Sequence, residues 1–99
     1  MIADLSNTKI WVGDDLELSK QVQLKAFELG WRWYINGTKI NVDVHNALYF
    51  YSDQTIFRSS SGRDYFNNQT THREILLADL GIGVEQITSI STDVELIMF

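Results

Sequence analysis

Residues 14–31 read DDLELSKQVQLKAFELGW and predict the main helix of the fold. Asp14 and Glu17 stand at capping-box spacing, so each side chain can accept a hydrogen bond from a free backbone N–H where the helix begins. Apolar residues then recur with the helical period, at Leu18, Val22, Ala26 and Leu29, with Phe27 beside them. Gly30 follows at the position of a left-handed C-terminal cap. We therefore predict a helix over residues 15–29.

The segment after the helix, residues 31–44, predicts a β-hairpin. Its centre is Asn36-Gly37, a dipeptide typical of the two-residue type I′ turn because both turn residues need positive φ. One face of this hairpin would carry the pairs Ile35 with Thr38, Trp33 with Ile40 and Trp31 with Val42. The other face would pair Tyr34 with Lys39 and Arg32 with Asn41. Turn chemistry and side-chain alternation select the same register.

Residues 47–51 and 55–58 predict a second hairpin, which turns about Asp53-Gln54. Side chains alternate between the two faces of a strand. This alternation places one set inward, namely Leu48, Phe50 and Phe57. It places another set outward, namely Tyr49, Tyr51 and Arg58.

The remainder of the chain predicts further strands, with residues 8–12 as the first and residues 87–90 and 94–99 as the last two. Residues 72–80 admit two interpretations. Thr71 and Glu74 are spaced to cap a helix that ends at Gly81, whereas residues 73–77 also suit a strand followed by a single turn, which we prefer. Polar breaks fall at 59–62 and 67–71. The fold class is α+β, with one helix (15–29) packed on a mostly antiparallel sheet of five to seven strands.

Composition indicates one domain over residues 1–99. The chain has 99 residues, of which 44% are hydrophobic, and its net charge is −5. This negative charge disfavours a protein whose main role is to bind the phosphates of nucleic acids. The absence of Cys excludes disulfides and zinc-thiolate sites. The start Met1-Ile2-Ala3-Asp4 lacks the pattern of a signal peptide, and no apolar run reaches the length of a membrane span. We expect a cytoplasmic protein that contacts no membrane.

A series of short patterns extends from about residue 10 to residue 80. They are Val22-Gln23, the junction Phe27-Glu28-Leu29-Gly30-Trp31-Arg32-Trp33, Leu48-Tyr49-Phe50, Asp53, Phe66-Asn67-Asn68 and Arg73-Glu74-Ile75. Together they resemble a style of small accessory protein encoded by bacteriophages and prophages. The resemblance implies the host cytoplasm as location and favours the strand over 73–77. Because such phage proteins often bind and disable host or defence proteins, it also implies a host protein as partner, and it supplies no catalytic residues.

The sequence contains few candidate catalytic residues. Asp43 and His45 are two residues apart, so on a strand they would share a face, as an Asp–His pair requires. Ser59, Ser60 and Ser61 supply hydroxyl groups, but no nucleophile-elbow pattern brings them to the histidine. A solvated strand end explains Asp43 and His45 better than a catalytic pair does. We predict that the chain is not an enzyme.

The sequence also offers little for metals, phosphates or cofactors. Asp14, Asp15 and Glu17 could attract a cation, but helix capping accounts for them, and we predict no metal site. The run 59–63, Ser-Ser-Ser-Gly-Arg, could wrap an anion with its N–H groups. It lacks a nucleotide-binding fingerprint and is typical of a loop. We predict no cofactor.

The outer face of the two hairpins is the main candidate for binding. If both registers hold, it gathers basic and aromatic side chains, namely Arg32, Tyr34, Lys39, Tyr49, Tyr51 and Arg58. Tyr and Arg dominate the energetics of protein interfaces, and aromatic residues on a sheet can also stack nucleic-acid bases. Tyr and Arg are equally ordinary residues on a solvated strand face, and the terminal strands or a second copy could cover them.

Two functions from different classes follow from this face. The first is a non-enzymatic, phage-type protein that docks on a host protein, possibly a defence protein, and inhibits or modulates it. The alternative is a nucleic-acid or nucleotide binder that uses the same face. If the apolar segment 94–99 is an edge strand, it would favour pairing of two copies and hence a homodimer.

Overall fold

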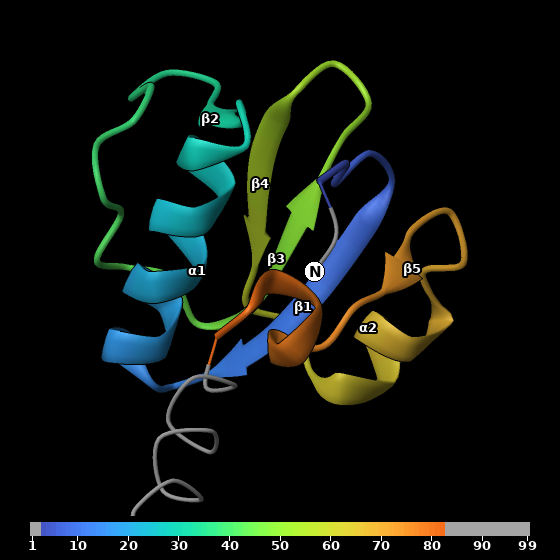
Figure 1. Cartoon of the computed structure of the whole chain (residues 1–99). Helices are drawn as coiled ribbons and strands as arrows, with labels where there is room; N and C mark the ends of the chain where they lie inside the picture. The colour runs from blue at the N-terminus through green and yellow to red at the C-terminus, as the bar shows by residue number, and fades with distance from the viewer. Residues whose placement is uncertain (1–2, 83–99) are drawn as a thin grey trace, which may run out of the picture.

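A computed structural model describes residues 3–82 of the chain, so the strands predicted over 87–90 and 94–99 lie outside the described residues. The elements in order are β1 (Thr8–Gly13), α1 (Leu16–Glu28), β2 (Arg32–Trp33), β3 (Asn46–Phe50), β4 (Thr55–Ser59), α2 (Arg63–Asn68), β5 (Arg73–Glu74) and the 3-10 helix η1 (Leu77–Leu80). They form an α+β fold with one main helix (Figure 1), which confirms the predicted class.

The five strands form one sheet in the order β2-β4-β3-β1-β5. The central pairs, β1 with β3 and β3 with β4, are antiparallel. The outer pairs, β1 with β5 and β2 with β4, are parallel. The sheet is therefore mixed, and its longer, central pairs are antiparallel as expected. The two short outer pairs are parallel, because both outer strands arrive by connections longer than a hairpin turn.

Helix α1 begins and ends close to the predicted bounds. Its N-cap is Asp15 rather than Asp14, and the Asp15 carboxylate accepts a hydrogen bond from Leu18 N at 3.0 Å. At the other end, Gly30 has a φ of +105°, and Trp31 N donates to Ala26 O at 2.9 Å. This left-handed glycine followed by a buried apolar residue is a Schellman motif. Helix α1 is thus defined at both ends by local chemistry.

The predicted hairpin over 31–44 does not form. The chain reverses after Trp33, which exchanges backbone hydrogen bonds with Gly37 at 2.8 and 3.1 Å, and no strand follows over 38–44. β2 pairs instead with β4, Arg32 opposite Thr55 and Trp33 opposite Ile56. The predicted type I′ register is therefore wrong, and only Gly37 of the Asn36-Gly37 pair has a positive φ.

A buried glutamine explains the path of residues 34–45. Gln23 is fully buried on α1, and its Oε1 accepts from Trp33 Nε1 at 3.0 Å and from Asn41 N at 2.7 Å. Its Nε2 donates to Ser19 Oγ at 3.0 Å and to Asn41 O at 2.9 Å. A primary amide offers two donors and two acceptor sites. Because every one of them is used, the returning segment is attached to α1 rather than to β2.

The second predicted hairpin is confirmed as β3 and β4, but its register is shifted. Tyr49 lies opposite Phe57, and Leu48 lies opposite Arg58. The loop has three residues between Tyr51 and Thr55, and Gln54 takes a left-handed φ of 68°. A shift of one residue moves every side chain of a strand to the other face. Phe57 therefore lies on the outer face and Arg58 on the face toward α1, the reverse of our prediction.

The sheet has a helix layer on each side (Figure 1). The main core lies between the sheet and α1 with η1, and its largest fully buried members include Leu5, Ile10, Leu48, Phe50, Ile56 and Leu80. On the outer face, Phe66 of α2 packs against Ala47 and Tyr49, with Trp11 alongside. We expected a polar break at 67–71 and did not predict α2.

Lys9 ties α2 to the sheet. It is buried on the outer face, and its Nζ donates to the backbone carbonyls of Phe66 and of Gln69, the latter at 2.9 Å. The ammonium also lies 4.5 Å from the centre of the Phe66 ring. Carbonyls at the end of a helix favour a cation. Lys9 thus supplies hydrogen-bond donors to carbonyls at the end of α2, and these carbonyls and the Phe66 ring stabilise its positive charge in return.

Residues 72–80 follow the preferred interpretation of a strand and then a turn. β5 is limited to Arg73–Glu74, and η1 ends at Gly81 in the left-handed conformation, with φ at 76°. Asp79 accepts a hydrogen bond from Leu76 N at 2.8 Å, which begins the turn. The helix alternative is therefore excluded for this segment.

Candidate functional site

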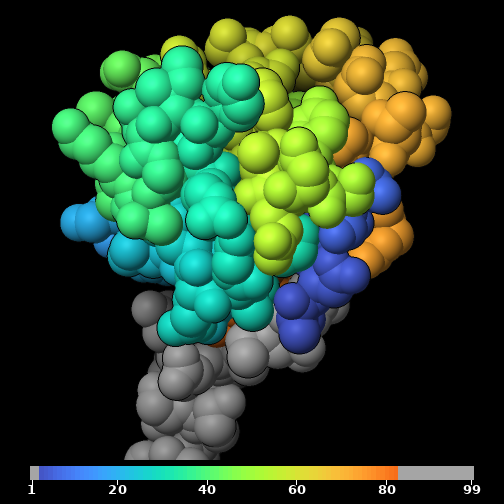
Figure 2. Space-filling view, turned by 90° about the horizontal axis from the view of Figure 1, so that it is seen from above, coloured from blue at the N-terminus to red at the C-terminus, as the bar shows by residue number. Residues whose placement is uncertain are grey.

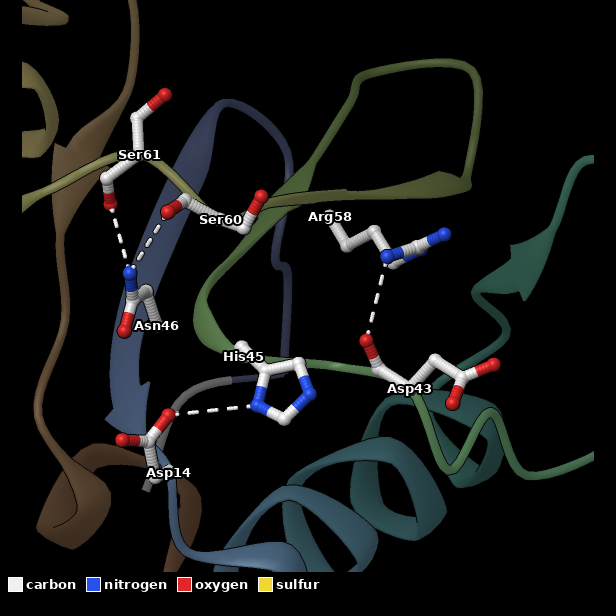
Figure 3. Close-up of polar contacts among 7 residues, drawn as sticks. All are labelled: Asp14, Asp43, His45, Asn46, Arg58, Ser60 and Ser61. Atoms are coloured by element: carbon white, nitrogen blue, oxygen red, sulfur yellow. Dashed lines mark hydrogen bonds and ion pairs between the residues drawn. The ribbon is translucent and has the colours of Figure 1, made fainter.

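The six predicted binding residues do not share one exposed face. Tyr49 is only 6% exposed because α2 covers it. Arg58 lies on the opposite face, where its Nη1 donates to Asp43 O at 3.2 Å (Figure 3). Arg32, Tyr34, Lys39 and Tyr51 are exposed, but the first three belong to β2 and to the loop that replaced the predicted hairpin.

What the outer face does gather is a cluster of rings in edge-to-face contact. His72 lies 5.3 Å from Tyr49 and 4.6 Å from Tyr51, measured between ring centres. Tyr51 in turn lies 5.1 Å from Phe57, and Tyr49 lies 6.0 Å from Phe66. Edge-to-face pairs add to the stability gained from burial alone. The cluster brings together five rings, which come from β3, the β3–β4 turn, β4, α2 and the loop before β5.

Beside this cluster the surface is hollowed, with a volume of about 110 Å³. Rings form most of its wall, from Tyr49, Tyr51, Phe57, Tyr65 and His72. Ser59, Gln69 and Thr71 complete it, so every lining side chain is neutral apart from the titratable His72. We call this the outer-face hollow.

Two residues that line this hollow each have a buried polar atom with no hydrogen-bond partner among the described residues. These atoms are the hydroxyl of Tyr49 and Nε2 of His72, and each residue is only 6% exposed. The other ring nitrogen, Nδ1 of His72, lies 3.0 Å from the Thr71 hydroxyl. If that hydroxyl donates to Nδ1, Nε2 carries the proton; if Nδ1 donates, Nε2 is an acceptor.

Both of these residues are biased toward their neutral forms. Burial lowers the pKa of His72 below its ordinary value, and the positive charge of Lys9 adds to the effect. Burial also raises the pKa of Tyr49, with smaller contributions from Tyr65 and Tyr51. At neutral pH the wall of the outer-face hollow therefore holds an uncharged imidazole and an uncharged phenol.

The lowered pKa of His72 predicts a loss of stability in mild acid. The unfolded chain binds a proton at His72 near pH 6.5, whereas the folded chain resists it. The free energy of unfolding therefore keeps its full value above that pH, where His72 is neutral in both states. It declines as the pH falls below it, because the unfolded chain then binds a proton more readily than the folded one. Thermal unfolding between pH 7.5 and 5 should show a smaller decline for His72→Phe than for the unchanged protein. The exposed His45, replaced by Gln, is the control, and equal declines in all three proteins would contradict the prediction.

A second surface lies at the β2 end of the sheet, which we call the edge surface and define by Tyr34, Ile35, Phe57 and Arg58. Tyr34 is 77% exposed and Ile35 is 86% exposed, and Phe57 is also open to solvent at 46%. They border a hollow of about 300 Å³ whose wall includes Trp33 and Ile56. Figure 2 shows the residues after β2 and those of the β3–β4 turn side by side on this side of the molecule.

The catalytic candidates do not assemble. His45 Nδ1 lies 3.3 Å from Asp14 Oδ1, and both side chains are exposed, while the carboxylate of Asp43 is directed away from His45 (Figure 3). The backbone carbonyls of Ser60 and Ser61 accept hydrogen bonds from Asn46 Nδ2 at 2.9 and 3.1 Å. This arrangement holds the loop in place and does not bring a serine hydroxyl to the imidazole.

Residues that the sequence offered as ligands for a cation or an anion make structural contacts instead. Asp15 caps α1, and within residues 3–82 no three His, Asp or Glu side chains cluster as metal ligands. Gly62 is the N-cap of α2, and Arg63 pairs with Glu74 at 2.8 Å while its guanidinium lies 4.8 Å from the Phe66 ring. No helix in the described part of the chain has the length and apolar character to span a bilayer.

Comparison with protein-family models, with curated proteins and with solved structures gave no match to this chain. The site is therefore described from its own geometry. Sequence reasoning missed three residues of this region. His72 lines the outer-face hollow, Phe66 packs against Tyr49 of its wall, and the charge of Lys9 lowers the pKa of His72. Phe66 carried a usable signal, because it is the one large apolar residue between Tyr65 and Ile75.

Proposed function

We propose that this chain is a non-enzymatic, phage-type binding protein of the host cytoplasm, which docks on a host protein and inhibits or modulates it. The observation that supports this proposal is the edge surface, where Tyr34 and Ile35 are the most exposed large apolar residues of the described chain. Exposed apolar side chains that adjoin one another mark interaction sites more often than scattered ones do.

The composition of the edge surface suits a protein partner. Aromatic residues and Arg supply most of the binding energy in protein interfaces, and Tyr34, Phe57 and Arg58 adjoin one hollow. A partner side chain that enters it would contact Trp33, Ile35 and Ile56, which line the same hollow. The net charge of −5 favours a partner with a neutral or basic surface.

The test is capture of a partner from bacterial lysate by the protein and by the double variant Tyr34→Ala/Ile35→Ala. We expect the variant to lose capture at least tenfold, since removal of a hot spot costs about 2 kcal/mol or more. Its folding should be unaffected because both side chains project into solvent.

The matched control is Leu16→Ala/Leu24→Ala, which removes two exposed apolar side chains from α1, at 52% and 51% exposure. This control should retain capture. Equal loss of capture in both double variants would mean that non-specific hydrophobic contacts, not the edge surface, bind the partner. Full capture by both variants would show that the edge surface is not the binding site.

The nucleic-acid alternative receives less support from the geometry. Tyr49 is buried, and Arg58 is turned to the α1 side, so the predicted stacking face is divided. The same capture experiment separates the two functions, because phosphate contacts weaken steeply as salt rises. Signal that disappears with nuclease or at high salt would favour nucleic acid over a protein partner.

A further inference from the structure

Arg58 is the one charged side chain among the described residues that line the hollow of the edge surface. The other lining residues are apolar or carry a neutral polar group, namely Trp33, Tyr34, Ile35, Asn36, Asn41, Ile56 and Phe57. Near a protein surface the effective dielectric constant is about 20 rather than the roughly 80 of water, so a charge there attracts an opposite one more strongly. The chemistry of this one side chain therefore bears on which group enters the hollow.

The guanidinium of Arg58 is exposed and only partly used. Within residues 3–82 its one side-chain hydrogen bond runs from Nη1 to Asp43 O, at 3.2 Å. Figure 3 shows the second terminal nitrogen turned away from that carbonyl. A guanidinium carries five N–H donors. The backbone of Asp43 thus anchors the side chain through one donor and leaves others for a ligand.

Arg63 shows the contrast with an arginine that has its carboxylate. Its Nη2 lies 2.8 Å from Glu74 Oε2, and its guanidinium lies 4.8 Å from the centre of the Phe66 ring. None of the ion pairs within residues 3–82 includes Arg58. In the described part of the chain, the positive charge beside the hollow therefore has no carboxylate partner.

We propose, on the basis of the docking function of the edge surface, that the partner segment carries an aspartate or glutamate next to a bulky apolar side chain. The apolar side chain fills the hollow against Trp33, Ile35 and Ile56, and the carboxylate pairs with Arg58. Arginine and carboxylate often form two parallel hydrogen bonds, which fix the orientation of the pair as well as strengthening it.

The size of the hollow suits such a pair of side chains. A cavity of about 150 Å³ holds one benzene ring. The hollow of the edge surface, at about 300 Å³ and open to solvent, has room for one large apolar side chain and for a short acidic one beside it. A segment with two adjacent bulky residues would leave one of them outside.

The net charge of −5 is compatible with this acidic segment. Salt screens exposed charges over about 8 Å at physiological ionic strength. Distant acidic residues therefore act on the approach of the whole partner, whereas Arg58 acts on the group in contact with it. A partner whose surface is neutral or basic overall can present one acidic residue in the segment that docks.

The test is an NMR titration of the whole chain with capped tetrapeptides, acetyl-Ala-Trp-Xaa-Ala-amide, in which Xaa is Asp, Asn or Lys. Backbone amide shifts should concentrate on the residues that line the hollow, 33–36, 41 and 56–58. The Asp peptide should bind at least about threefold more tightly than the Asn peptide, in the range of an exposed ion pair. The Lys peptide should bind most weakly, although the net charge of the protein favours it.

Substitutions of Arg58 separate its charge from its shape. Arg58→Gln should bind the Asp and Asn peptides equally, and Arg58→Glu should reverse the order so that the Lys peptide binds most tightly. Arg58→Lys should keep a weaker preference for Asp, because an ammonium lacks the planar fork of donors. Arg73→Gln removes another exposed arginine, on β5, and should leave the order unchanged. Each variant should keep its thermal midpoint within about 4 °C, as expected for an exposed side chain.

Three results would overturn the proposal: equal binding of the Asp and Asn peptides, tightest binding of the Lys peptide by the unchanged protein, and no shift around the hollow with any peptide. Capture from lysate distinguishes this failure from failure of the docking function. If Arg58→Glu retained the partner and Tyr34→Ala/Ile35→Ala lost it, docking would stand and the acidic segment would be wrong. If Tyr34→Ala/Ile35→Ala also retained it, the docking function itself would be wrong.

Discussion

Replacing Gln23 by Leu should lower the free energy of unfolding by about 3 kcal/mol, because each buried polar group left without a partner costs about 1–3 kcal/mol. The side chain of Gln23 makes four hydrogen bonds, to Ser19, Trp33 and twice to Asn41. Leucine restores the volume but none of these bonds. Trp33 Nε1 and the Ser19 hydroxyl remain in the core, where water cannot replace the amide.

Urea denaturation followed by tryptophan fluorescence measures this loss, since Trp33 is one of the side chains affected. Gln21→Leu on the exposed side of α1 is the matched control and should change stability by no more than about 0.5 kcal/mol. If the two substitutions had similar effects, the network around Gln23 would not be holding residues 34–45 in place.

Replacing Phe66 by Ala should be at least as damaging, at about 3–5 kcal/mol, the usual cost of removing a buried phenylalanine. Phe66 is the buried residue of α2, 5.4 Å from the Trp11 ring and in contact with Tyr49. Without it, α2 has little apolar surface to bury, and the two carbonyls that hold Lys9 lose their fixed position. We expect α2 to detach from the sheet.

Calorimetric unfolding gives the size of this effect, and NMR of the α2 amides shows whether the helix is lost. The control is Tyr65→Ala, which removes a neighbouring ring of α2 that is half exposed, and it should cost about 1 kcal/mol or less. A cost for Phe66→Ala within that range would show that α2 is held by something other than this ring.

The parts of the fold that the sequence predicted correctly are those determined by local chemistry. The bounds of α1 follow from a capping carboxylate, a periodic apolar stripe and Gly30. The hairpin of β3 and β4 follows from two short apolar runs around a polar turn. In each case the residues that define the element lie within a few positions of it, so their pattern is visible without knowledge of the fold.

The errors arise where a distant contact overrides a local preference. Asn36-Gly37 favours a two-residue turn, but Gln23 holds Asn41 from a helix 18 positions away, and β2 pairs with β4 instead. Within the second hairpin, one extra loop residue reversed the faces of Phe57 and Arg58. That single shift removed Arg58 from the predicted binding face and placed Phe57 on the wall of the outer-face hollow.

The candidate site was therefore predicted only in part. Tyr34 and Arg58 belong to the edge surface, whereas Tyr49 and Tyr51 line the outer-face hollow, and Phe57 is the residue that the two surfaces share. His72 could not be placed from the sequence, because its position beside Tyr49 depends on the parallel pairing of β5 with β1. Parallel neighbours are joined by long connections, and their register leaves no short-range pattern.

The shortness of the two outer strands of the described sheet bears on whether further chains can add to its edges. Long, free strand edges act as templates on which further chains add, which leads toward amyloid-like aggregates. In the described sheet, β2 and β5 each contribute only two residues at the edges, and each begins with an exposed Arg. Within residues 3–82, Tyr34 and Ile35 therefore lie beside a strand edge too short to serve as a template for strand addition.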